Sequence, residues 1–490
     1  MSNKPLAMAR TDAAAASVTD PVTDPVITQA YATQLRALGL AQADAGGSTT
    51  ITGRDPAIAS PHRLGGAMAV AAALQGTALA ALWRLQSGQG QDVSVDIRRA
   101  AHAVHPSRYL KQNGYPIGFD FTYPEPGNGY FRTHDGRWIY LVSTRPNLRN
   151  GLLELLDCAN QFQAITDAVR QWDGAALEQA CIERGLPVSL VRSPAEWREH
   201  PHARALLRQP LIEITRIGDG APRLWEGGAR PLSGLRVLDL SHILAGPGLA
   251  RTLAEHDADV LRISAPRQSD PINFMLDTGF GKRSAFLDFD QPAEVERGLQ
   301  LAADADVVVQ SYSPGSLARR GLSLEAMAAR NPGLIYVSLS CFGECGGPWS
   351  ERVGFDHNSQ STTGISWVEG GADSPCLPPT TLVADYITAY LGTAGALAAL
   401  WRRAREGGSY HVKVSLARTC MWVQDLGYIE DPSQPATLDP VLAGIDGPFG
   451  HIEYLAPITE FSQTPARWNS PPLPLGASRA EWAPQPAHSK

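Results

Sequence analysis

The sequence is poor in cysteine and in long apolar runs, and both features limit the classes of protein to which it can belong. It contains six cysteines in 490 residues, of which only Cys341 and Cys345 lie close together. This usage excludes a disulfide framework, and without a second pair at metal-ligand spacing no metal site is expected. The N-terminus holds no apolar core of signal-peptide length, and no stretch approaches the ~18 uninterrupted apolar residues of a membrane helix. We therefore predict a cytoplasmic protein.

Positive charge is also scarce. The chain has 42 Lys and Arg against 49 Asp and Glu, a net charge of −7. Nucleic acids and anionic membranes are not attracted to a surface that is acidic on average, so neither is expected as a partner. Hydrophobic residues at 43%, with 46 Gly and 37 Pro, are typical of a globular enzyme with many turns. The length predicts two or three domains.

One helical pattern occurs twice in the chain. Residues 64–83 form a run of small apolar residues without a polar face, followed by a turn and a short strand. The pattern returns near residue 384, where ALAALWR at 396–402 repeats ALAALWR at 78–84, an offset of 318 residues (401 − 83). Asp385 in the second copy corresponds to Ala67 in the first. If this carboxylate does chemistry, only one copy is active.

The remaining patterns predict an α/β fold with a second, smaller domain. The segment GLRVLDLS, a Gly/Pro turn, a helix and DVLRIS form a βαβ unit, which ADVVVQSY and GLIYVSLS continue as buried parallel strands. This predicts a doubly wound, Rossmann-like layer. The expected parts are a flexible tail (1–45) that leads into a short helix around residues 28–40, the first helix–strand copy (46–110), a small α+β domain (111–230), the doubly wound domain with the Asp385 helix (231–430) and an extended C-terminal arm (431–490).

Several ordered motifs resemble those of family III CoA-transferases, the CaiB/BaiF type that includes formyl-CoA and carnitine CoA-transferases. They are VLDLSHILAGPGLARTLAEHDADVLRISAP, GKRSAFLDF, ADVVVQSYSPGSLARRGLSLEAMAARNPGLIYVSLSCFG and GFDHNSQSTTG, followed by the Asp385 helix at the family's spacing. The resemblance covers nearly all of 231–430. It implies a soluble transferase that moves CoA between an acyl-CoA and a free carboxylic acid, without a cofactor.

Asp385 suits the role of nucleophile that the resemblance implies. A carboxylate can accept an acyl group as a mixed anhydride and then hold CoA as a thioester. Because Asp385 opens a long helix, we expect the helix dipole to keep it ionised at neutral pH. The small residues that follow allow other backbone to approach and exclude water, which would hydrolyse the anhydride.

The resemblance also implies a set of CoA contacts near the strand ends. Lys282, Arg283 and Arg319 are the phosphate candidates, and Ser311 and Tyr312 are expected near the adenine. The turn that precedes the first helix of the layer is expected to lie against the CoA through His242, Ile243, Leu244 and Ala245. Relatives often carry a basic residue or Pro where this chain has Ser264 and Ala265, which counts against tight phosphate binding. Arg262 and Arg267 are the candidates to compensate. The GNG turn at 127–129 is a candidate oxyanion site.

The order of the parts departs from the family. Relatives place the nucleotide-binding half before the small domain, whereas here the small domain comes first, as if two fused copies had each lost a complementary part. The chain then holds enough for one active site. The family forms interlocked dimers, so a homodimer is expected, although the rearrangement puts this in doubt.

Three other functions remain open from the residues. A 2-methylacyl-CoA racemase needs two bases, and Phe355 stands where racemases carry His, unless His357 replaces it. A rearranged chain could instead be an inactive CoA-binding partner subunit. NAD binding is poorly supported, because Arg251 stands where the dinucleotide fingerprint requires a third Gly.

Overall fold

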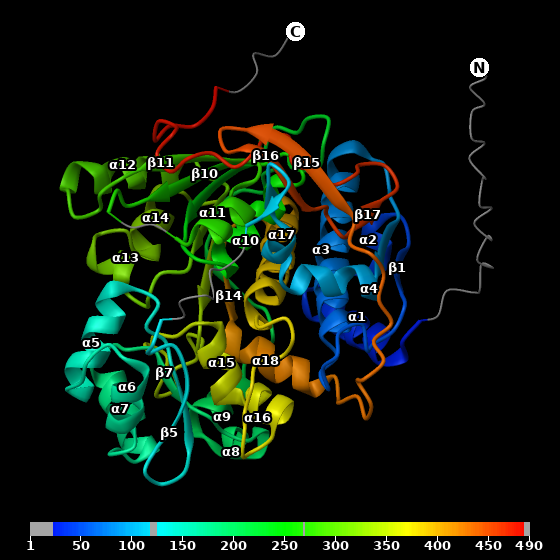
Figure 1. The fold of residues 1–490 in the computed structure, drawn as a ribbon. Helices are drawn as coiled ribbons and strands as arrows, with labels where there is room; N and C mark the ends of the chain where they lie inside the picture. The colour runs from blue at the N-terminus through cyan, green and yellow to red at the C-terminus, as the bar shows by residue number, and fades with distance from the viewer. Residues whose placement is uncertain (1–22, 118–124, 268–269, 485–490) are drawn as a thin grey trace, which may run out of the picture.

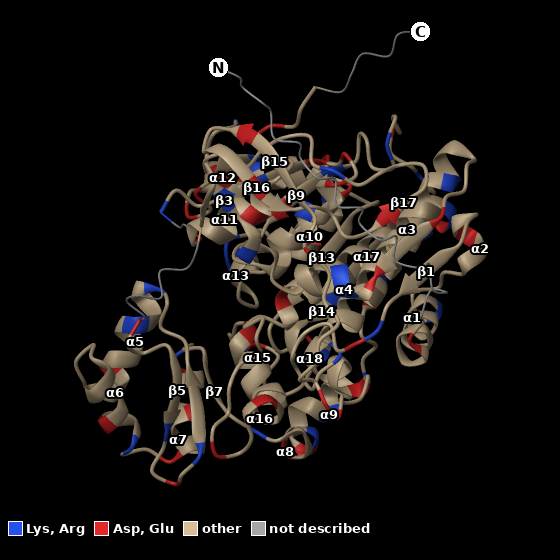
Figure 2. Ribbon diagram, turned by 45° about the vertical axis from the view of Figure 1, so that its right-hand side comes forward, with Lys and Arg blue, Asp and Glu red and all other residues tan. Residues whose placement is uncertain are grey.

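The computed structural model describes residues 23–117, 125–267 and 270–484. A mostly parallel sheet forms the centre, a bundle of apolar helices lies beside it, and a small α+β unit projects from the lower left in Figure 1. Charged residues of both signs are spread over the elements rather than gathered on one of them, as Figure 2 shows.

The large sheet has seven strands in the order β11-β10-β9-β12-β13-β14-β8. All neighbouring pairs are parallel except β14 with β8. Counted along the chain from β9, the six parallel strands lie in the order 3-2-1-4-5-6, an order typical of doubly wound sheets. The sequence predicted a doubly wound layer without a strand order. The strands are β8 (Glu213–Gly218), β9 (Arg236–Leu240), β10 (Asp259–Ser264), β11 (Lys282–Phe286), β12 (Val307–Gln310), β13 (Ile335–Ser340) and β14 (Ser409–Ser415).

Helices cover both faces of this sheet, because its central strands are apolar on both sides. One core cluster includes Val237, Val307 and Val337, and a second cluster on the other face includes Leu238 and Val308. The helices of this half are α10 (Ala245–Ala254), α11 (Ile272–Gly279), α12 (Pro292–Ala303), α13 (Ser316–Arg319), α14 (Leu324–Arg330), α15 (Asp356–Thr363), α16 (Ile365–Gly370), α17 (Ala384–Glu406) and α18 (Leu416–Asp425).

The two copies of the repeated pattern pack against each other. Helix α3 (Leu64–Ser87) lies along α17, and α10 packs on the other side of α17 (Figure 1). Helix α3 is long and apolar enough to cross a membrane, but its whole apolar window is buried inside the protein. The strand after α17 joins the large sheet, whereas β2 (Val93–Asp96) pairs with β1 (Thr49–Thr52) and β17 (Glu460–Phe461).

The segment 25–45 is ordered by packing, and its first helix confirms the short helix expected around residues 28–40. The expected flexible tail therefore does not extend over the whole range 1–45. Helix α1 (Pro25–Ala37) buries Ile27, Tyr31 and Leu35, and packs on α3. It is followed by the short α2 (Gln42–Ala45). The part of the predicted tail at 1–22 lies outside the described residues.

The predicted small domain is smaller than the range 111–230. Strands β5 (Gly129–Arg132) and β6 (Trp138–Leu141) form the expected hairpin, and β7 (Val188–Leu190) completes a three-stranded sheet. The three remaining strands belong elsewhere: β8 joins the large sheet, and β3 and β4 form a sheet with C-terminal strands. The other elements of the range are β3 (Lys111–Gln112), β4 (Tyr115–Pro116), α5 (Pro146–Leu156), α6 (Phe162–Val169), α7 (Gly174–Glu183), α8 (Pro194–Glu199) and α9 (Pro201–Leu207).

The C-terminal segment is not simply an extended arm. It contains a hairpin of β15 (Leu442–Gly447) and β16 (Gly450–Leu455), which extends the β3–β4 pair into a four-stranded antiparallel sheet. Beyond β17 the described chain runs without regular structure over the large sheet, with Trp468 buried against Phe280. The link from β2 to β3 of the four-stranded sheet consists of α4 (Ile97–Ala100) and two 3₁₀ turns, Ala101–Val104 and Pro106–Tyr109.

Glycines on α17 let neighbouring elements approach it closely, which gives a test of the fold. A Cβ at Gly395 would lie 2.6 Å from Val412 Cγ1 and 2.7 Å from Ile212 Cγ2. We expect Gly395→Leu to lower the free energy of unfolding by about 1–3 kcal/mol, because overpacking forces the neighbours to shift. Thermal unfolding measures the change. The control Gln300→Leu, at an exposed position of α12, should change it by a few tenths of a kcal/mol; equal effects of the two variants would contradict the packing argument.

Candidate active site

A strained turn follows β9 at the point where the strand order reverses. Ile243 has φ +62°, a left-handed conformation that is unusual for a β-branched residue and costs about 1–3 kcal/mol. Its amide donates to Asp270 Oδ2 at 3.0 Å, and Asp270 is itself buried between Arg262 and Arg145. This anchored carboxylate holds the turn, so that α10 begins at Ala245 with its amide directed toward the neighbouring helix α17.

Asp385 lies in the first turn of α17 and is 8% exposed. The Ala245 amide donates a hydrogen bond to its carboxylate. The two helices come this close because they carry glycines where they touch: a Cβ at Gly248 would lie 3.2 Å from Ala389 Cβ, and one at Gly392 would lie 2.7 Å from Leu249 Cδ1. The small residues noted in the sequence therefore determine how near the β9 turn is to Asp385.

A second carboxylate supports the start of α17. Asp356 Oδ2 accepts the amides of Asp385 at 2.8 Å and Val383 at 3.2 Å, and Gln360 Nε2 donates to Asp356 Oδ1 at 2.6 Å. Asp356 is the first residue of α15 and is 2% exposed. It thus joins two helices and satisfies backbone donors that a helix N-terminus leaves open.

The electrostatics of Asp385 differ from the sequence expectation. Burial, and then the charge of Asp356, raise the pKa of Asp385 well above its usual range, while the Ala245 hydrogen bond opposes this. The helix dipole alone was expected to keep the carboxylate ionised. That expectation is wrong, because desolvation in a closed environment outweighs a partial charge at a helix end.

Asp385 opens into a cavity of about 930 Å³. It runs between the carboxyl ends of the parallel strands and the small unit, which contributes Arg145 and Pro187 to its wall. Seven sequence-predicted residues line this Asp385 cavity together: His242, Ile243, Leu244, Ala245, Ser311, Tyr312 and Asp385.

The predicted residues at the strand ends support one another. The rings of His242 and Tyr312 lie 4.7 Å apart, and Ser311 Oγ bonds to the backbone of His242. Arg145 Nη2 donates to His242 Nδ1 at 3.2 Å. Burial lowers the pKa of His242 to about 4, which leaves the ring neutral at neutral pH and able to accept this bond.

The three predicted phosphate-binding cations do not line the cavity in the described structure. Lys282 is 2% exposed and bonds to Asp239 and the Pro247 carbonyl, and Arg283 pairs with Asp259. Arg319 is exposed at the end of α13. The reason is the direction of each side chain, which the sequence does not reveal. The cavity instead presents Arg145, Arg267 and Arg320.

Arg145 was missed in the sequence because it belongs to the small unit, 97 residues before His242. Arg267 had been considered only as a possible compensation for Ala265. It pairs with Asp288 and Asp290, and Asp290 also contacts Arg320.

Other sequence candidates lie outside the cavity wall. The GNG turn leads into β5 of the small unit, with Gly127 close to Ser143. His357, the possible second base of a racemase, bonds to Tyr140 through Nδ1 at 2.9 Å. Phe355 lines the cavity in its place. Among the described residues, the cavity wall therefore contains Asp385 but no histidine of α15.

A scan against family models matches CoA-transferase family III over residues 31–214 and 232–440. The chain belongs to CoA-transferase family III. The two matched segments together cover most of the chain.

Curated family III proteins are similar in sequence to parts of this chain. An acyl-CoA transferase of Gibberella moniliformis is 33% identical over 52% of this chain and 47% of the relative. The acetyl-coenzyme A transferase nodX of Hypoxylon pulicicidum is 31% identical over 60% and 53%. The succinyl-CoA–L-malate CoA-transferase alpha subunit of Chloroflexus aurantiacus is 32% identical over 46% and 55%. The chain thus spans about half the length of the curated relatives it matches.

Among solved structures, a CaiB/BaiF family protein of Brucella suis is 30% identical over 40% of this chain and 55% of that chain, with a TM-score of 0.36.

The neighbouring residues Arg319 and Arg320 provide a test of which arginine of this family III protein faces the cavity. Arg320 lines the Asp385 cavity and Arg319 does not. We expect Arg320→Ala to weaken CoA binding about tenfold, because a phosphate loses a charged donor, and Arg319→Ala to change it less than about twofold. Isothermal titration with CoA at fixed ionic strength measures both. A larger loss in Arg319→Ala would restore the sequence-based assignment.

Proposed function

We propose that this protein transfers CoA from an acyl-CoA thioester to a free carboxylic acid, with Asp385 as the nucleophile. One observation carries the proposal: Asp385 lines the same cavity as the turn 242–245 and the residues Ser311 and Tyr312. A CoA bound along the strand ends would direct its thioester toward a buried carboxylate. Membership of CoA-transferase family III supports the substrate class, and the names of the curated relatives agree with it.

The chemistry needs one carboxylate that acts twice. An oxygen of Asp385 attacks the thioester carbonyl, the C–S bond breaks, and a mixed anhydride and a CoA thiolate result. The thiolate then attacks the Asp385 carbonyl carbon, which releases the donor acid as its carboxylate and leaves CoA on Asp385 as a thioester. The acceptor carboxylate reverses these two steps: it forms a new anhydride, and the thiolate attacks the acceptor carbonyl. The products are a new acyl-CoA and free Asp385.

The surroundings of Asp385 suit these intermediates. An acyl group on the carboxylate removes its charge, so the burial and the nearby Asp356 that disfavour the ionised form favour the acylated one. The Ala245 amide supplies a fixed donor to an oxygen of this carboxylate, which helps to hold the ionised form before attack. Close packing of α10 on α17 keeps water from the anhydride.

We also propose how CoA lies in the cavity. The turn 242–245 contacts its pantetheine arm, Ser311 and Tyr312 lie near the adenine, and Arg267 and Arg320 at the mouth face phosphates. All the residues named here belong to one chain. The helix of the first copy, α3, which carries Ala67, packs against α17. In a homodimer each subunit would then carry its own site.

The nucleophile is tested by an isosteric change. We expect Asp385→Asn to lower the rate of label exchange between an acyl-CoA and its free acid by at least about 10³-fold, because an amide neither attacks a thioester nor forms the anhydride. CoA binding should persist. Asp173→Asn, an exposed carboxylate of the small unit, is the matched control and should behave as the native protein.

Trapping gives the direct evidence. Hydroxylamine or borohydride added during turnover should modify Asp385, and mass spectrometry of the peptide locates the change. Modification elsewhere, or full exchange by Asp385→Asn, would refute the assignment.

The effect of Asp356 on the pKa of Asp385 predicts how the pH profile of kcat/KM changes when Asp356 is replaced. Asp385 reacts only when ionised, so the rate falls as the pH drops through its pKa, and the charge of Asp356 raises that pKa. We expect Asp356→Asn to move the acidic limb of the kcat/KM profile to lower pH, since a like charge is removed while one acceptor oxygen remains. A profile that stays in place or moves to higher pH would contradict the coupling.

A further inference from the structure

A strained loop leads into the helix that carries Asp385. In this loop, residues 379–383, Thr381 has φ +59°, a left-handed conformation that is unfavourable for a β-branched side chain. Such a conformation persists only where the surrounding structure holds it. Asp385 follows Thr381 by four residues and lies in the first turn of α17. The groups that hold the loop 379–383 therefore also hold the nucleophile.

One side of the loop is held by α15. Gln360 Nε2 donates to the Thr381 carbonyl at 2.8 Å, and Asp356 Oδ2 accepts the Val383 amide at 3.2 Å. Both donors and acceptors of α15 are buried. The position of the loop thus depends first on the position of α15.

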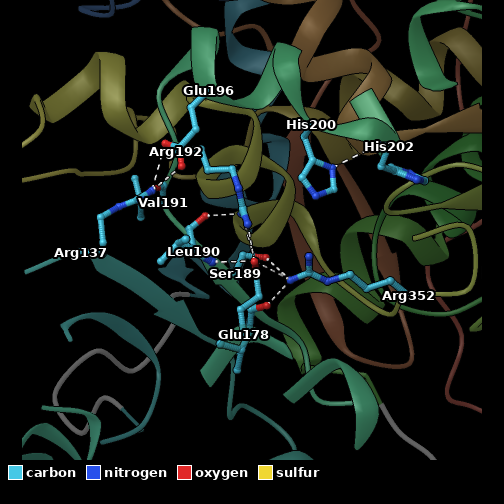
Figure 3. A network of polar contacts seen from close by, with 11 residues as sticks. Arg137, Glu178, Ser189, Leu190, Val191, Arg192, Glu196, His200, His202 and Arg352 are labelled. Carbon is cyan, nitrogen blue, oxygen red and sulfur yellow. Dashed lines mark hydrogen bonds and ion pairs between the residues drawn. The ribbon is translucent and has the colours of Figure 1, made fainter. Parts of the chain in front are cut away.

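Helix α15 is itself tied to the small unit by a buried ion cluster. Arg192, after β7, and Arg352, in the loop before α15, converge on Glu178 of α7 (Figure 3). Arg192 Nη1 and Arg352 Nη2 lie 3.1 and 3.0 Å from Glu178 Oε1. Because Arg352 precedes Asp356 by four residues, the cluster fixes the start of α15.

The other side of the loop is held by the first copy of the repeat. His105 lies between the two 3₁₀ turns that follow β2 and α4, and its Nδ1 bonds to the Thr380 carbonyl at 2.6 Å. Arg108 Nη1 donates to the Pro379 carbonyl at 2.5 Å, and Arg108 Nη2 donates to Thr381 Oγ1 at 3.3 Å. Three consecutive residues of the loop are therefore bonded to a segment that lies more than 270 residues earlier in the chain.

His105 is suited to act as a fixed donor, since it is only 4% exposed. A carbonyl oxygen can only accept, so the bond to Thr380 requires the proton on Nδ1. Burial lowers the pKa of His105 to about 4, and the ring is therefore neutral at neutral pH. Arg108 is exposed by comparison, and its bonds to the loop compete with water.

The two copies hold each other's loops. The loop before α3 contains Pro61 and His62 and is held by the segment after α18. There the Ile429 amide donates to the Pro61 carbonyl at 2.8 Å, and His62 forms a β-bridge with Tyr428. Only one of the two loops leads to a carboxylate, because the position that corresponds to Asp385 in the first copy is Ala67.

We propose that the first copy, which lacks a nucleophile of its own, positions the nucleophile of the second, and that His105 is the positioning residue. Its bond to Thr380 keeps the strained loop closed, so that Asp385 stays beside the Ala245 amide. This assignment rests on the proposed transferase function. Among the described residues that line the Asp385 cavity His105 does not occur, so it acts on turnover and not on CoA binding.

A donor can be removed and restored at this position. His105→Ala removes the donor, and His105→Asn supplies another, because the amide Nδ2 of Asn can take the place of the imidazole Nδ1. His102→Ala is the matched control from the same segment. The His102 ring bonds to Tyr109 at 2.5 Å and to the Leu438 carbonyl at 2.7 Å, so this variant also loses a ring and its hydrogen bonds.

The assay is identity exchange with acetyl-CoA, butyryl-CoA, succinyl-CoA and glutaryl-CoA, each mixed with its own labelled acid. We expect His105→Ala to lower kcat about 30-fold, because a small displacement of a reacting group is costly, while KM for the acyl-CoA changes less than about twofold. His105→Asn should recover kcat to within about fivefold of the native value. His102→Ala should stay within about twofold of the native kcat.

Thermal unfolding shows which variants are folded at the assay temperature. If His105→Ala is not, Arg108→Met decides in its place, because it removes two bonds to the same loop from an exposed position. We expect a fall in kcat of about fivefold for Arg108→Met, again with KM unchanged. An unchanged kcat in that case overturns the proposed hold on the loop.

The outcomes separate this assignment from the transferase function. If the native protein exchanges none of the four acids, the transferase function is overturned and the role of His105 with it. If the native protein exchanges and His105→Ala keeps the native kcat, or changes KM alone, the role of His105 is overturned and the transferase function stands. An equal loss of kcat in His102→Ala, or no recovery in His105→Asn, overturns the role of His105 as well.

Discussion

The hydrogen bonds between Asp356 and the first amides of α17 are the interaction on which the site depends. A helix that begins in the protein interior must satisfy its free amides, and here a buried carboxylate of another helix does so. The consequence is a pair of adjacent carboxylates in a closed environment. Asp385 is therefore held in place by the group that makes its ionised form costly.

This arrangement bears on the proposed role of Asp385 as an acyl carrier. In the proposed reaction, loss of charge on acylation would relieve both the desolvation of the carboxylate and its repulsion by Asp356. The strained Ile243 turn contributes in the opposite direction, because it aims a backbone donor at Asp385. Strain at that turn is offset by Asp270, which Arg262 and Arg145 hold from two different units.

The cavity is assembled from segments that are far apart in the chain. Arg145 and Pro187 come from the small unit, His242 to Ala245 from the first parallel strand, and Asp385 from a helix that follows the fifth. These segments are far apart in the chain and are brought together by the α3–α17–α10 packing and by the contacts of the small unit with the strand ends. Their order in the chain matters less than the surfaces they bury.

Much of this could be predicted from the residues alone. Apolar runs of four to six residues separated by helical patterns determine a parallel sheet, and the 318-residue repeat aligns Asp385 with Ala67, so that only one copy carries a carboxylate there. The Gly/Pro turn after β9 could be placed because parallel strands end at one edge. These features depend on local periodicity, which a sequence displays.

Only the tertiary structure decided which charges face the cavity. Lys282 and Arg320 are equally basic in sequence, yet one is buried against Asp239 and the other lines the cavity mouth. The high pKa of Asp385 and the bond from His105 to the loop before α17 likewise arise from groups that meet across 29 and 275 residues. Burial and Coulomb interactions depend on distances in space, and the linear order of residues does not contain them.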